Sequence, residues 1–482
     1  MKNELYDAFK AKDARFDGRF FVGVSSTGIY CRPTCRAKLP MAKNCSYYSS
    51  AAAAESAGFR PCLICRPELA PGIPYTYATE MLAHKAARMI EEDCNASLVS
   101  IAERLGCTDR HLRRTFSKEY GVSPIEYAQT CRLLLAKNIL TETNLSMPEV
   151  ASAAGFGSTR RFNSLFLKQY SISPTALRKQ ASKGLDSDSK ISLSLGYRPP
   201  YLWNDILDFL SYRAIKGVEK VTDETYHRTV SLKTREHGNV QGWLSVRNEP
   251  KRNSLKVTTS ASLIPILSQV LSRIRTLFDL YCDPETVYEG LESMNSIRNG
   301  IYVKGTRIPG CFDPFEMSVR CVLGQQITVK AASTLASRMA EKYGKPIQTD
   351  VEGLTHIFPS AWDILELDGP LADHLGPLGI TSQKSNTISK LATAIEHRII
   401  DFGICASPEN EMTKLMEIPG IGKWTAQYIA MRAMGWTDAF LDTDLGIKKA
   451  MSPLTPKEMV DTAEAWAPWR SYATINLWNS LK

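Results

Sequence analysis

Long apolar runs are missing from this sequence of 482 residues. No stretch approaches the roughly 18 consecutive apolar residues that cross a membrane as a helix, and the N-terminus mixes acidic and basic residues without the apolar core of an export signal. These absences exclude membrane and secreted proteins, so we expect a cytoplasmic location. Because the chain is longer than one ordinary domain, three or four domains are expected.

Acidic residues are scarce in the first part of the chain. Residues 1–190 hold 27 Lys and Arg against 18 Asp and Glu, whereas residues 191–482 hold 32 of each kind. The net charge of +9 therefore lies wholly in the first part. Such a surplus favours a polyanionic partner, although many soluble domains carry one.

Most of the twelve cysteines lack the spacing of a metal site. Cys31 and Cys35 form one close pair and, after 26 intervening residues, Cys62 and Cys65 form another. Two such pairs can supply four thiolates to one tetrahedral zinc ion. The alternatives are two disulfides, which need an oxidising compartment, and four unrelated buried thiols. We expect the other eight to be reduced and mostly structural: Cys45, Cys94, Cys107, Cys131, Cys282, Cys311, Cys321 and Cys405.

Basic residues surround the two pairs, and such charge favours thiolates and attracts phosphate: Arg32, Arg36, Lys38, Lys43, Arg60 and Arg66. A closed four-cysteine site usually only holds a fold together. However, the runs Thr27–Ala37 and Gly58–Cys62 resemble the N-terminal domain of the Ada family over about residues 1–70. The resemblance implies one zinc ion that is structural and also activates Cys31, which accepts a methyl group from a methylated DNA phosphate.

Methylation of Cys31 would lower the negative charge of this site. Four thiolates on Zn²⁺ carry a formal charge of minus two, which repels DNA phosphates, and a thioether at Cys31 reduces it to minus one. We therefore expect methylation to strengthen DNA binding by an adjoining domain. A stable thioether has no ready route back, so each molecule is expected to accept one methyl group.

Residues 75–183 contain an internal repeat. The run Ile101–Gly106 leads to Gly121–Pro124, and the run Val150–Phe156 leads to Ser173-Pro174. A short helix, a turn containing Gly and a second amphipathic helix make a helix-turn-helix unit. One unit is equally typical of a plain helical bundle, but two in tandem resemble the AraC-type DNA-binding domain. Two recognition helices in one chain can read successive major-groove turns, so we expect a monomer.

The second helix of each unit is the predicted recognition helix. Its polar side chains can reach base edges and phosphates, although they can also form the solvated face of a bundle. They are Arg110, His111, Arg113 and Arg114 in the first unit, and Thr159, Arg160, Arg161 and Asn163 in the second.

The polar run Ser182–Lys190 has the composition of a flexible linker. Ada proteins continue with a guanine-O6 methyltransferase that carries a Pro-Cys-His-Arg site, and no such tetrapeptide occurs here. We therefore expect that activity to be absent.

Residues 195–300 predict a small α+β layer, which by itself names no function. The predicted elements are a helix over Leu202–Tyr212, strands over Tyr226–Leu232, Gln241–Val246 and Ser254–Thr259, turns at Gly238-Asn239 and Arg252-Asn253, and a long amphipathic helix over Leu263–Tyr281.

The run Ile418–Ala426 fits a helix-hairpin-helix. Its Gly420 and Gly422 would allow a tight turn to bring backbone N–H groups and a helix N-terminus to a DNA phosphate, although such a run can be any helix-connecting turn. Asp444 follows 22 residues after Gly422, beyond an apolar helix predicted over Ala426–Met434. The combination resembles the helix-hairpin-helix DNA glycosylases.

From Tyr197 to the C-terminus, the chain resembles 3-methyladenine DNA glycosylase II, the AlkA type. The runs that carry this resemblance are Tyr197–Tyr201, Leu277–Leu280, Pro309–Glu316, Val322–Gln326 and Trp466–Ala473. It implies excision of N-alkylated purines, such as 3-methyladenine and 7-methylguanine, by hydrolysis without a cofactor.

Such an enzyme flips the damaged base out and stabilises a sugar that becomes oxocarbenium-like as the glycosidic bond breaks. A nearby carboxylate can do this and can orient the attacking water. The resemblance gives this role to Asp444, because Asp442, two residues away, would point elsewhere on a helix. It places Trp424, Tyr428 and Trp478 in a pocket that stacks on the electron-poor base, whereas such aromatics are more often core.

Two positions near this pocket set further expectations. Related enzymes that also cleave the strand carry a Schiff-base lysine where Trp424 stands. Lys423 lies one residue earlier, about 100° around the helix, so we expect a monofunctional enzyme and a phosphate contact for Lys423. The wedge that fills the gap left by the flipped base is leucine in the type enzyme and matches Gln326 here, so insertion is expected to be less apolar.

Together these patterns predict a multidomain, mainly α protein with a small α+β part that senses and repairs DNA alkylation. The expected partners are double-stranded DNA, both alkylated and promoter DNA, and RNA polymerase, in a bacterial cytoplasm at the nucleoid, without membrane contact. Two alternatives stay open: a transcription regulator whose glycosylase-like half only binds DNA, and a repair enzyme that uses its helix-turn-helix units as non-specific anchors. The expected domains are a zinc domain over 1–72, an all-α double helix-turn-helix domain over 76–182, an α+β domain over 192–302 and an all-α helix-hairpin-helix glycosylase domain over 303–482.

Overall fold

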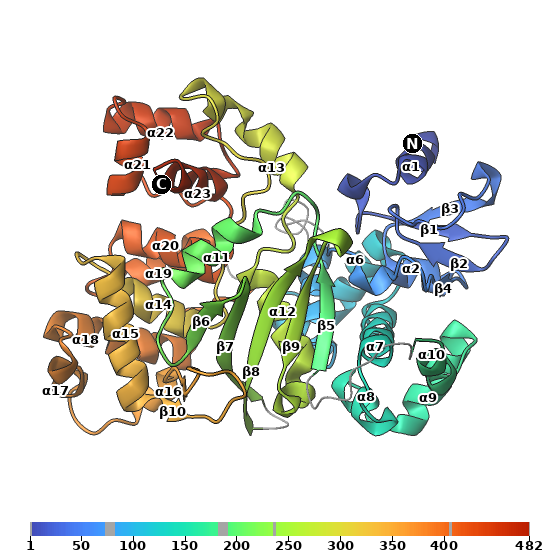
Figure 1. Ribbon diagram of the computed structural model, residues 1–482, viewed down its shortest axis with the longest axis horizontal. Coiled ribbons are helices and arrows are strands. Elements are labelled where there is room, and N and C mark those ends of the chain that lie inside the picture. The colour runs from blue at the N-terminus through green and yellow to red at the C-terminus, as the bar shows by residue number, and fades with distance from the viewer. Residues whose placement is uncertain (1, 73–81, 182–190, 235–237, 404–406, 482) are drawn as a thin grey trace.

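The computed structural model describes residues 2–72, 82–181, 191–234, 238–403 and 407–481 (Figure 1). The predicted linker Ser182–Lys190 and Cys405 lie outside the described residues. No helix in the described ranges combines the length and apolarity that a membrane crossing needs.

The N-terminal unit is built on a four-stranded sheet with strand order β3-β1-β2-β4. Its elements are α1 (Lys2–Ala11), η1 (Ala14–Phe16), β1 (Phe21–Val24), β2 (Ile29–Cys31), η2 (Ala42–Asn44), β3 (Cys45–Tyr48), α2 (Ala51–Ser56), β4 (Arg60–Pro61) and η3 (Pro67–Leu69). Strands β2 and β4 are parallel, with Tyr30 opposite Pro61. Because parallel neighbours end at the same edge, Cys31 at the end of β2 lies beside Cys62, which follows β4.

The second unit is built from helices. They are α4 (Leu82–Glu92), α5 (Leu98–Arg104), α6 (Asp109–Tyr120), α7 (Pro124–Glu142), α8 (Met147–Ala153), α9 (Thr159–Tyr170) and α10 (Pro174–Ala181). Two helix-turn-helix units, α5–α6 and α8–α9, lie on either side of α7 in the chain. The side chains of Thr108 and Ser158 cap α6 and α9 by accepting backbone N–H bonds. Buried residues recur every fourth position, as in Phe162, Phe166 and Tyr170 of α9, which leaves the opposite face to solvent.

A five-stranded antiparallel sheet, with order β5-β9-β8-β7-β6, follows. This unit contains β5 (Ile191–Gly196), α11 (Trp203–Ser211), β6 (Glu219–Thr222), β7 (Thr225–Thr234), β8 (Gly238–Glu249), η4 (Pro250–Arg252), β9 (Ser254–Thr259), η5 (Ala261–Ile266) and α12 (Leu267–Leu277). The α+β layer is confirmed, but the helix predicted over Leu263–Tyr281 begins only at Leu267, because Pro265 lies in the preceding 3₁₀ segment. The turn predicted at Gly238-Asn239 is wrong, since both residues pair with β7.

The C-terminal unit is mainly helical. It contains α13 (Pro284–Leu291), η6 (Glu292–Ser296), α14 (Pro314–Leu323), α15 (Val329–Tyr343), β10 (Lys345–Pro346), β11 (His356–Ile357), α16 (Ala361–Leu365), α17 (Leu371–Leu375), η7 (Gly376–Leu378), α18 (Ser382–Glu396), α19 (Pro408–Met416), α20 (Lys423–Ala433), α21 (Leu445–Ala450), α22 (Pro456–Glu464) and α23 (Arg470–Asn479). The helix predicted to start at Ala426 starts at Lys423, directly after the Gly420–Gly422 turn.

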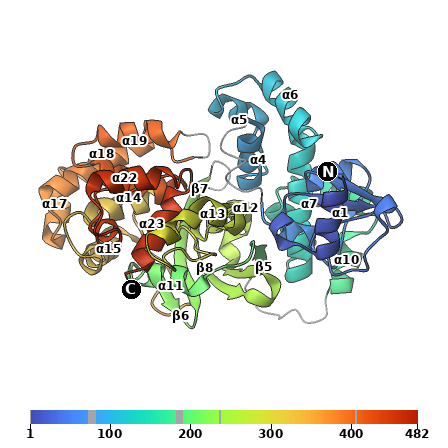
Figure 2. The ribbon, with the colours of Figure 1, turned by 90° about the horizontal axis from the view of Figure 1, so that it is seen from above.

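The units pack closely against one another. Figure 2 shows the N-terminal unit and the C-terminal helices at opposite ends, with the sheet unit between them. Helix α7 lies against β5, and one core of buried side chains continues from α7–α9 into the five-stranded sheet and α12. Arg198, which is only 1% exposed, donates to the carbonyl of Gly72 at 2.7 Å and so joins the sheet unit to the N-terminal unit.

Candidate functional site: a four-cysteine cluster and an aromatic group beside Asp444

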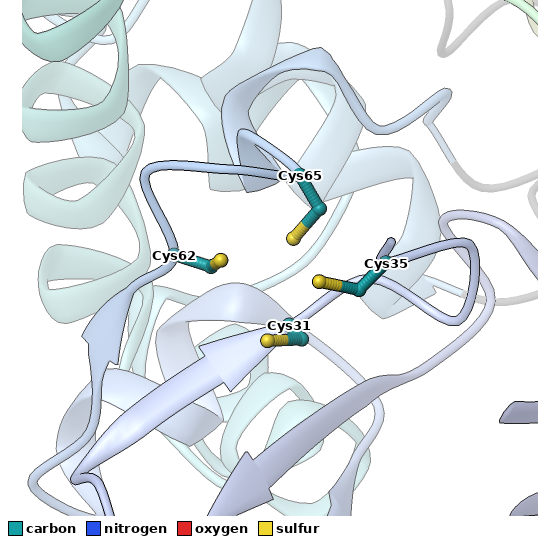
Figure 3. Close-up of side chains that lie close together, drawn as sticks. All are labelled: Cys31, Cys35, Cys62 and Cys65. Atoms are coloured by element: carbon teal, nitrogen blue, oxygen red, sulfur yellow. The ribbon is translucent and has the colours of Figure 1, made fainter. Parts of the chain in front are cut away.

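The four cysteines of the two close pairs converge on one point. Their sulfur atoms all lie within 4.8 Å of one another, and Figure 3 shows the four side chains gathered around a common centre. In a tetrahedral four-thiolate zinc site, the sulfurs are about 3.8 Å apart. The donor set Cys31, Cys35, Cys62 and Cys65 therefore fits zinc.

Arg32 supports this cluster from inside the fold. Its backbone N–H donates to Cys65 Sγ at 3.3 Å, and its guanidinium donates to the Cys65 carbonyl at 3.2 Å and pairs with Asp17. N–H donors to ligand sulfurs orient and stabilise thiolates. Because Arg32 is only 9% exposed, its guanidinium is engaged inside the protein, beside the cluster. The basic residues that stay exposed around the cluster are Arg36, Lys38, Lys43 and Arg60.

A buried carboxylate connects the strand of Cys31 to the helices. Oε1 of Glu55 accepts hydrogen bonds from the hydroxyls of Tyr30 at 3.0 Å and Tyr170 at 3.2 Å, and Oε2 accepts one from Thr130 at 3.0 Å. Burial raises the pKa of Glu55 to about 7, although these three hydrogen bonds oppose the rise. Tyr30 directly precedes Cys31, Thr130 lies in α7 and Tyr170 ends α9. Glu55 was not singled out from the sequence, where it is one glutamate after an alanine run.

Arg66 makes a second connection from the cluster to α7. It directly follows Cys65 and adopts a left-handed backbone, with φ of 53°. Its guanidinium donates to Glu142 at 2.6 Å and to Asn138 at 2.8 Å, both in α7. Glu142 in turn accepts from the backbone N–H of Ser194 in β5 at 2.7 Å. The guanidinium of Arg66 therefore donates its hydrogen bonds to carboxylate and amide groups inside the protein.

The predicted recognition helices present most of their predicted DNA contacts to solvent. The side chains of α6 and α9 that are exposed are Arg110, His111, Arg114, Arg160, Arg161 and Asn163. Arg113 is half-buried and forms an ion pair with Asp109 at 2.9 Å. Thr159 is half-buried as the first residue of α9.

Asp444 lies at the N-cap of α21, where two indoles hold its carboxylate. Oδ1 accepts from the backbone N–H of Ile447 at 3.1 Å and from Nε1 of Trp478 at 2.9 Å, and Oδ2 accepts from Nε1 of Trp424 at 3.2 Å. Such N–H donors fix the orientation of a carboxylate. The structure therefore brings α20, α21 and α23 together at one carboxyl group.

The three predicted pocket aromatics form one group beside this carboxylate. The rings of Trp424 and Tyr428 are 5.2 Å apart with an interplanar angle of 34°, and those of Tyr428 and Trp478 are 6.0 Å apart and nearly perpendicular. The phenol oxygen of Tyr428 accepts from the buried Arg432 at 2.8 Å. Arg432 was not identified from the sequence, because a buried arginine inside an apolar helix gives no motif.

Gly446 was also not identified, although it lies against this group. A Cβ at position 446 would stand 3.0 Å from Asp444 Oδ1 and 3.1 Å from Cδ1 of Trp478. Any side chain here would therefore crowd the contact between the indole and the carboxylate.

Asp442 and Lys423 pair with each other instead of joining this group. Their Nζ to Oδ2 distance is 2.7 Å. Lys423 keeps 57% of its side chain exposed, so the ammonium can still meet solvent, but the structure gives it a carboxylate partner that was not expected.

The predicted phosphate-binding turn is built on glycine. Gly420 has φ of +95°, and a Cβ there would lie 2.2 Å from Thr387 Oγ1, so only glycine fits. Gly422 is the N-cap of α20, and a Cβ there would meet open space within 4 Å. Gln326 is exposed in a separate turn that follows α14, with φ of +59°.

A converging thiol cluster, paired helix-turn-helix units and a carboxylate set among aromatics define a class of DNA-binding repair proteins. Family models match three stretches: the metal binding domain of Ada over residues 4–68, a helix-turn-helix domain over 101–180 and the AlkA N-terminal domain over 192–313. DNA is therefore a partner of this chain.

Curated relatives agree with this class. The "Probable bifunctional transcriptional activator/DNA repair enzyme AlkA" of Mycobacterium tuberculosis is 35% identical over 99% of this chain and 96% of that protein. DNA-3-methyladenine glycosylase 2 of Escherichia coli is 34% identical over 59% of this chain and 96% of its own length. The bifunctional transcriptional activator/DNA repair enzyme Ada of Escherichia coli is 34% identical over 27% of this chain and 36% of that protein. The chain belongs to the family of the bifunctional AlkA proteins.

Proposed function

We propose that this protein senses and repairs DNA alkylation with two activities on one chain. The cysteine cluster accepts a methyl group from a DNA methylphosphotriester on Cys31, and the methylated protein binds promoter DNA through its helix-turn-helix units to activate transcription. The C-terminal half excises N-alkylated purines by hydrolysis. The observation that carries the repair activity is the Asp444 carboxylate held between two indole N–H groups beside Tyr428.

We assign these activities to four domains. Their proposed limits are 1–72 for the methyl acceptor, 76–182 for the double helix-turn-helix, 192–302 for the α+β domain and 303–482 for the glycosylase. The family matches over 4–68, 101–180 and 192–313 support this division.

Methyl transfer to Cys31 uses the chemistry of an ionised thiol. One zinc ion, bound by Cys31, Cys35, Cys62 and Cys65, would keep the thiols ionised near neutral pH. The Cys31 sulfur attacks the methyl carbon of the phosphotriester and forms a carbon–sulfur bond. The methyl carbon–oxygen bond breaks, and its electron pair stays on the phosphate as a phosphodiester anion. The cluster thereby loses one negative charge, which weakens its repulsion of DNA.

The buried contacts around Glu55 and Arg66 support coupling between the cluster and the DNA-binding helices. Tyr30 reaches Thr130 of α7 and Tyr170 of α9 through one carboxylate, and Arg66 holds α7 directly. Tyr30, the neighbour of Cys31, is therefore two hydrogen bonds away from α9, which carries recognition residues, and Arg66, the neighbour of Cys65, bonds directly to α7, which joins the two helix-turn-helix units.

Base excision relies on Asp444 and the aromatic group. The flipped base stacks among Trp424, Tyr428 and Trp478, and the carboxylate stabilises the oxocarbenium-like sugar and orients the attacking water. No cofactor is needed for this step. Trp424 fills the position of the lyase lysine, and Lys423 is paired with Asp442, so we propose a monofunctional enzyme.

Base release from alkylated DNA tests the repair activity. Wild-type protein and Asp444→Asn are compared on DNA rich in 7-methylguanine and 3-methyladenine. Asparagine still caps α21, so the variant should bind DNA like wild type and release no base. If wild type releases no base, the glycosylase-like half only binds DNA and the protein is a regulator.

Footprinting with methylated and unmethylated protein tests the regulatory activity. We expect a protected promoter only after methylation, and no protected promoter under either condition would favour a repair enzyme with non-specific anchors. The protein would bind the promoter as a monomer, through its two recognition helices, and would activate transcription there by RNA polymerase. Because its substrate is chromosomal DNA, we place it at the nucleoid of the bacterial cytoplasm.

A further inference from the structure

The turn that follows α14 holds a strained backbone at an exposed position. Gln326 adopts φ of +59°, a left-handed conformation that is unfavourable for any residue other than glycine. Its neighbour Ile327 leaves 39% of its surface exposed. Such a conformation persists only when surrounding contacts impose it, and it is concentrated at functional sites.

Lys384 of α18 holds the backbone that immediately precedes Gln326. Its ammonium donates to the carbonyl oxygens of Leu323 and Gln325, both at 2.8 Å. These two carbonyls stand at the end of α14 and immediately before Gln326. Burial lowers the pKa of Lys384, in keeping with an ammonium that is withdrawn from water.

The side chain of Gln325 ties the same turn to the helix-hairpin-helix. Its amide Nε2 donates to the carbonyl of Gly420 at 2.8 Å and to the hydroxyl of Thr425 at 3.1 Å. One turn along α18 from Lys384, the hydroxyl of Thr387 donates to the carbonyl of Pro419 at 2.8 Å. Helix α18 therefore forms hydrogen bonds to both exposed turns, the one at Gln326 and the one at Gly420, and so holds them at a fixed spacing.

We propose that Lys384, together with Gln325, is a positioning residue that holds the Gln326 turn ready to enter the DNA stack while the Gly420 turn holds a phosphate. This inference rests on the proposed glycosylase function. A wedge fills the vacated stack only if it stands at a fixed place relative to the phosphate anchor, because an error of one ångström at a supporting contact loosens a site. A polar wedge such as Gln326 gains little free energy from apolar burial. Its insertion into the stack therefore depends more on being rigidly placed.

The test compares two lesions that differ in the free energy needed to flip the damaged base out of the duplex. Full-length Lys384→Met keeps the length of the side chain but loses the ammonium, Lys384→Arg keeps donors, and Lys390→Met removes an exposed lysine from the same helix as a matched control. Wild type and each variant are assayed for the single-turnover rate at which they excise one 7-methylguanine. The lesion stands opposite cytosine in one duplex and opposite a mismatched base in the other. Mismatched bases flip more easily and depend less on the wedge.

We expect Lys384→Met to slow excision of the paired lesion by about tenfold, to slow excision of the mismatched lesion by less than about threefold, and Lys384→Arg to restore most of the rate. In an Asp444→Asn background, 2-aminopurine beside the lesion should brighten less when Lys384→Met is added, because the stack opens less. Equal losses on both duplexes, or no loss with Lys384→Met, would overturn the proposal. If wild type excises from neither duplex, it is the glycosylase function that fails.

Discussion

The indole of Trp478 in α23 donates a hydrogen bond to Asp444 in α21 at 2.9 Å, across 34 residues of sequence. Trp424 donates to the same carboxylate at 3.2 Å, so two of the three rings of the proposed base pocket also support the carboxylate that we propose to be catalytic. In the proposed mechanism, these two tryptophans would both stack on the base and orient the Asp444 carboxylate.

Replacing Trp478 by Phe should separate these two roles. Trp478→Phe keeps an aromatic surface but removes the N–H donor, so the carboxylate loses one of its two indole contacts. Hydrogen bonds to charged groups contribute about 1.5–3 kcal/mol, and we expect a fall of at least about tenfold in the single-turnover rate of base release. Trp362→Phe, at an exposed position of α16, is the control. An unchanged rate in Trp478→Phe would show that the contact does not orient Asp444.

Cys31→Ser should lose methyl uptake and the methylation-dependent rise in promoter affinity together. A serine hydroxyl is neither a thiolate nucleophile nor a good zinc ligand. Transfer of labelled methyl groups from alkylated DNA and promoter affinity are measured in parallel with Cys45→Ser, which changes a half-buried thiol outside the cluster. Methyl uptake by Cys31→Ser would show that another cysteine is the acceptor.

Lys137→Met should destabilise the junction between the N-terminal unit and α7. The Lys137 and Glu68 side chains are each 1% exposed and pair at 2.5 Å. Removing one partner of a buried pair typically costs about 3–5 kcal/mol, and we expect a loss near the lower end because Arg66 still pairs with Glu68 at 3.0 Å. Urea denaturation of Lys137→Met beside Lys118→Met, an exposed position of α6, measures the difference. Equal midpoints would contradict a stabilising pair.

Local sequence patterns predicted most of the elements, because spacing within one helix or one strand decides them, whereas the family resemblance pointed to Asp444 and to the aromatic residues beside it. Trp424 and Tyr428, four residues apart, do share a helix face, and the strand predicted over Ser254–Thr259 is observed with those bounds. Contacts between distant segments could not be read in this way. Nothing near Lys384 indicates that its ammonium would meet the end of α14, and the burial of Arg32 depends on Asp17, which lies in a different loop.

The strands β5 and β6 were not predicted from the sequence, for two different reasons. β5 alternates serine with leucine, and its register is set by pairing with β9, from Ile191 opposite Thr259 to Gly196 opposite Ser254. β6 is four residues long and is held by β7. The alternation in β5 is a strand pattern that the prediction overlooked. The short β6 forms because β7 supplies its hydrogen bonds, which a sequence window does not contain.

Glu55 should make the stability of the N-terminal half depend on pH. Its pKa is raised by burial to about 7, from the usual 4.5. The folded state therefore binds a proton more tightly than the unfolded chain, and the free energy of unfolding falls as pH rises through this window. Glu55→Gln still accepts from Tyr30 and Tyr170 but cannot ionise. In urea denaturation, the two proteins should have similar midpoints near about pH 4.5, and wild type should fall below Glu55→Gln by about pH 8. A difference that stays constant over this range would contradict the raised pKa.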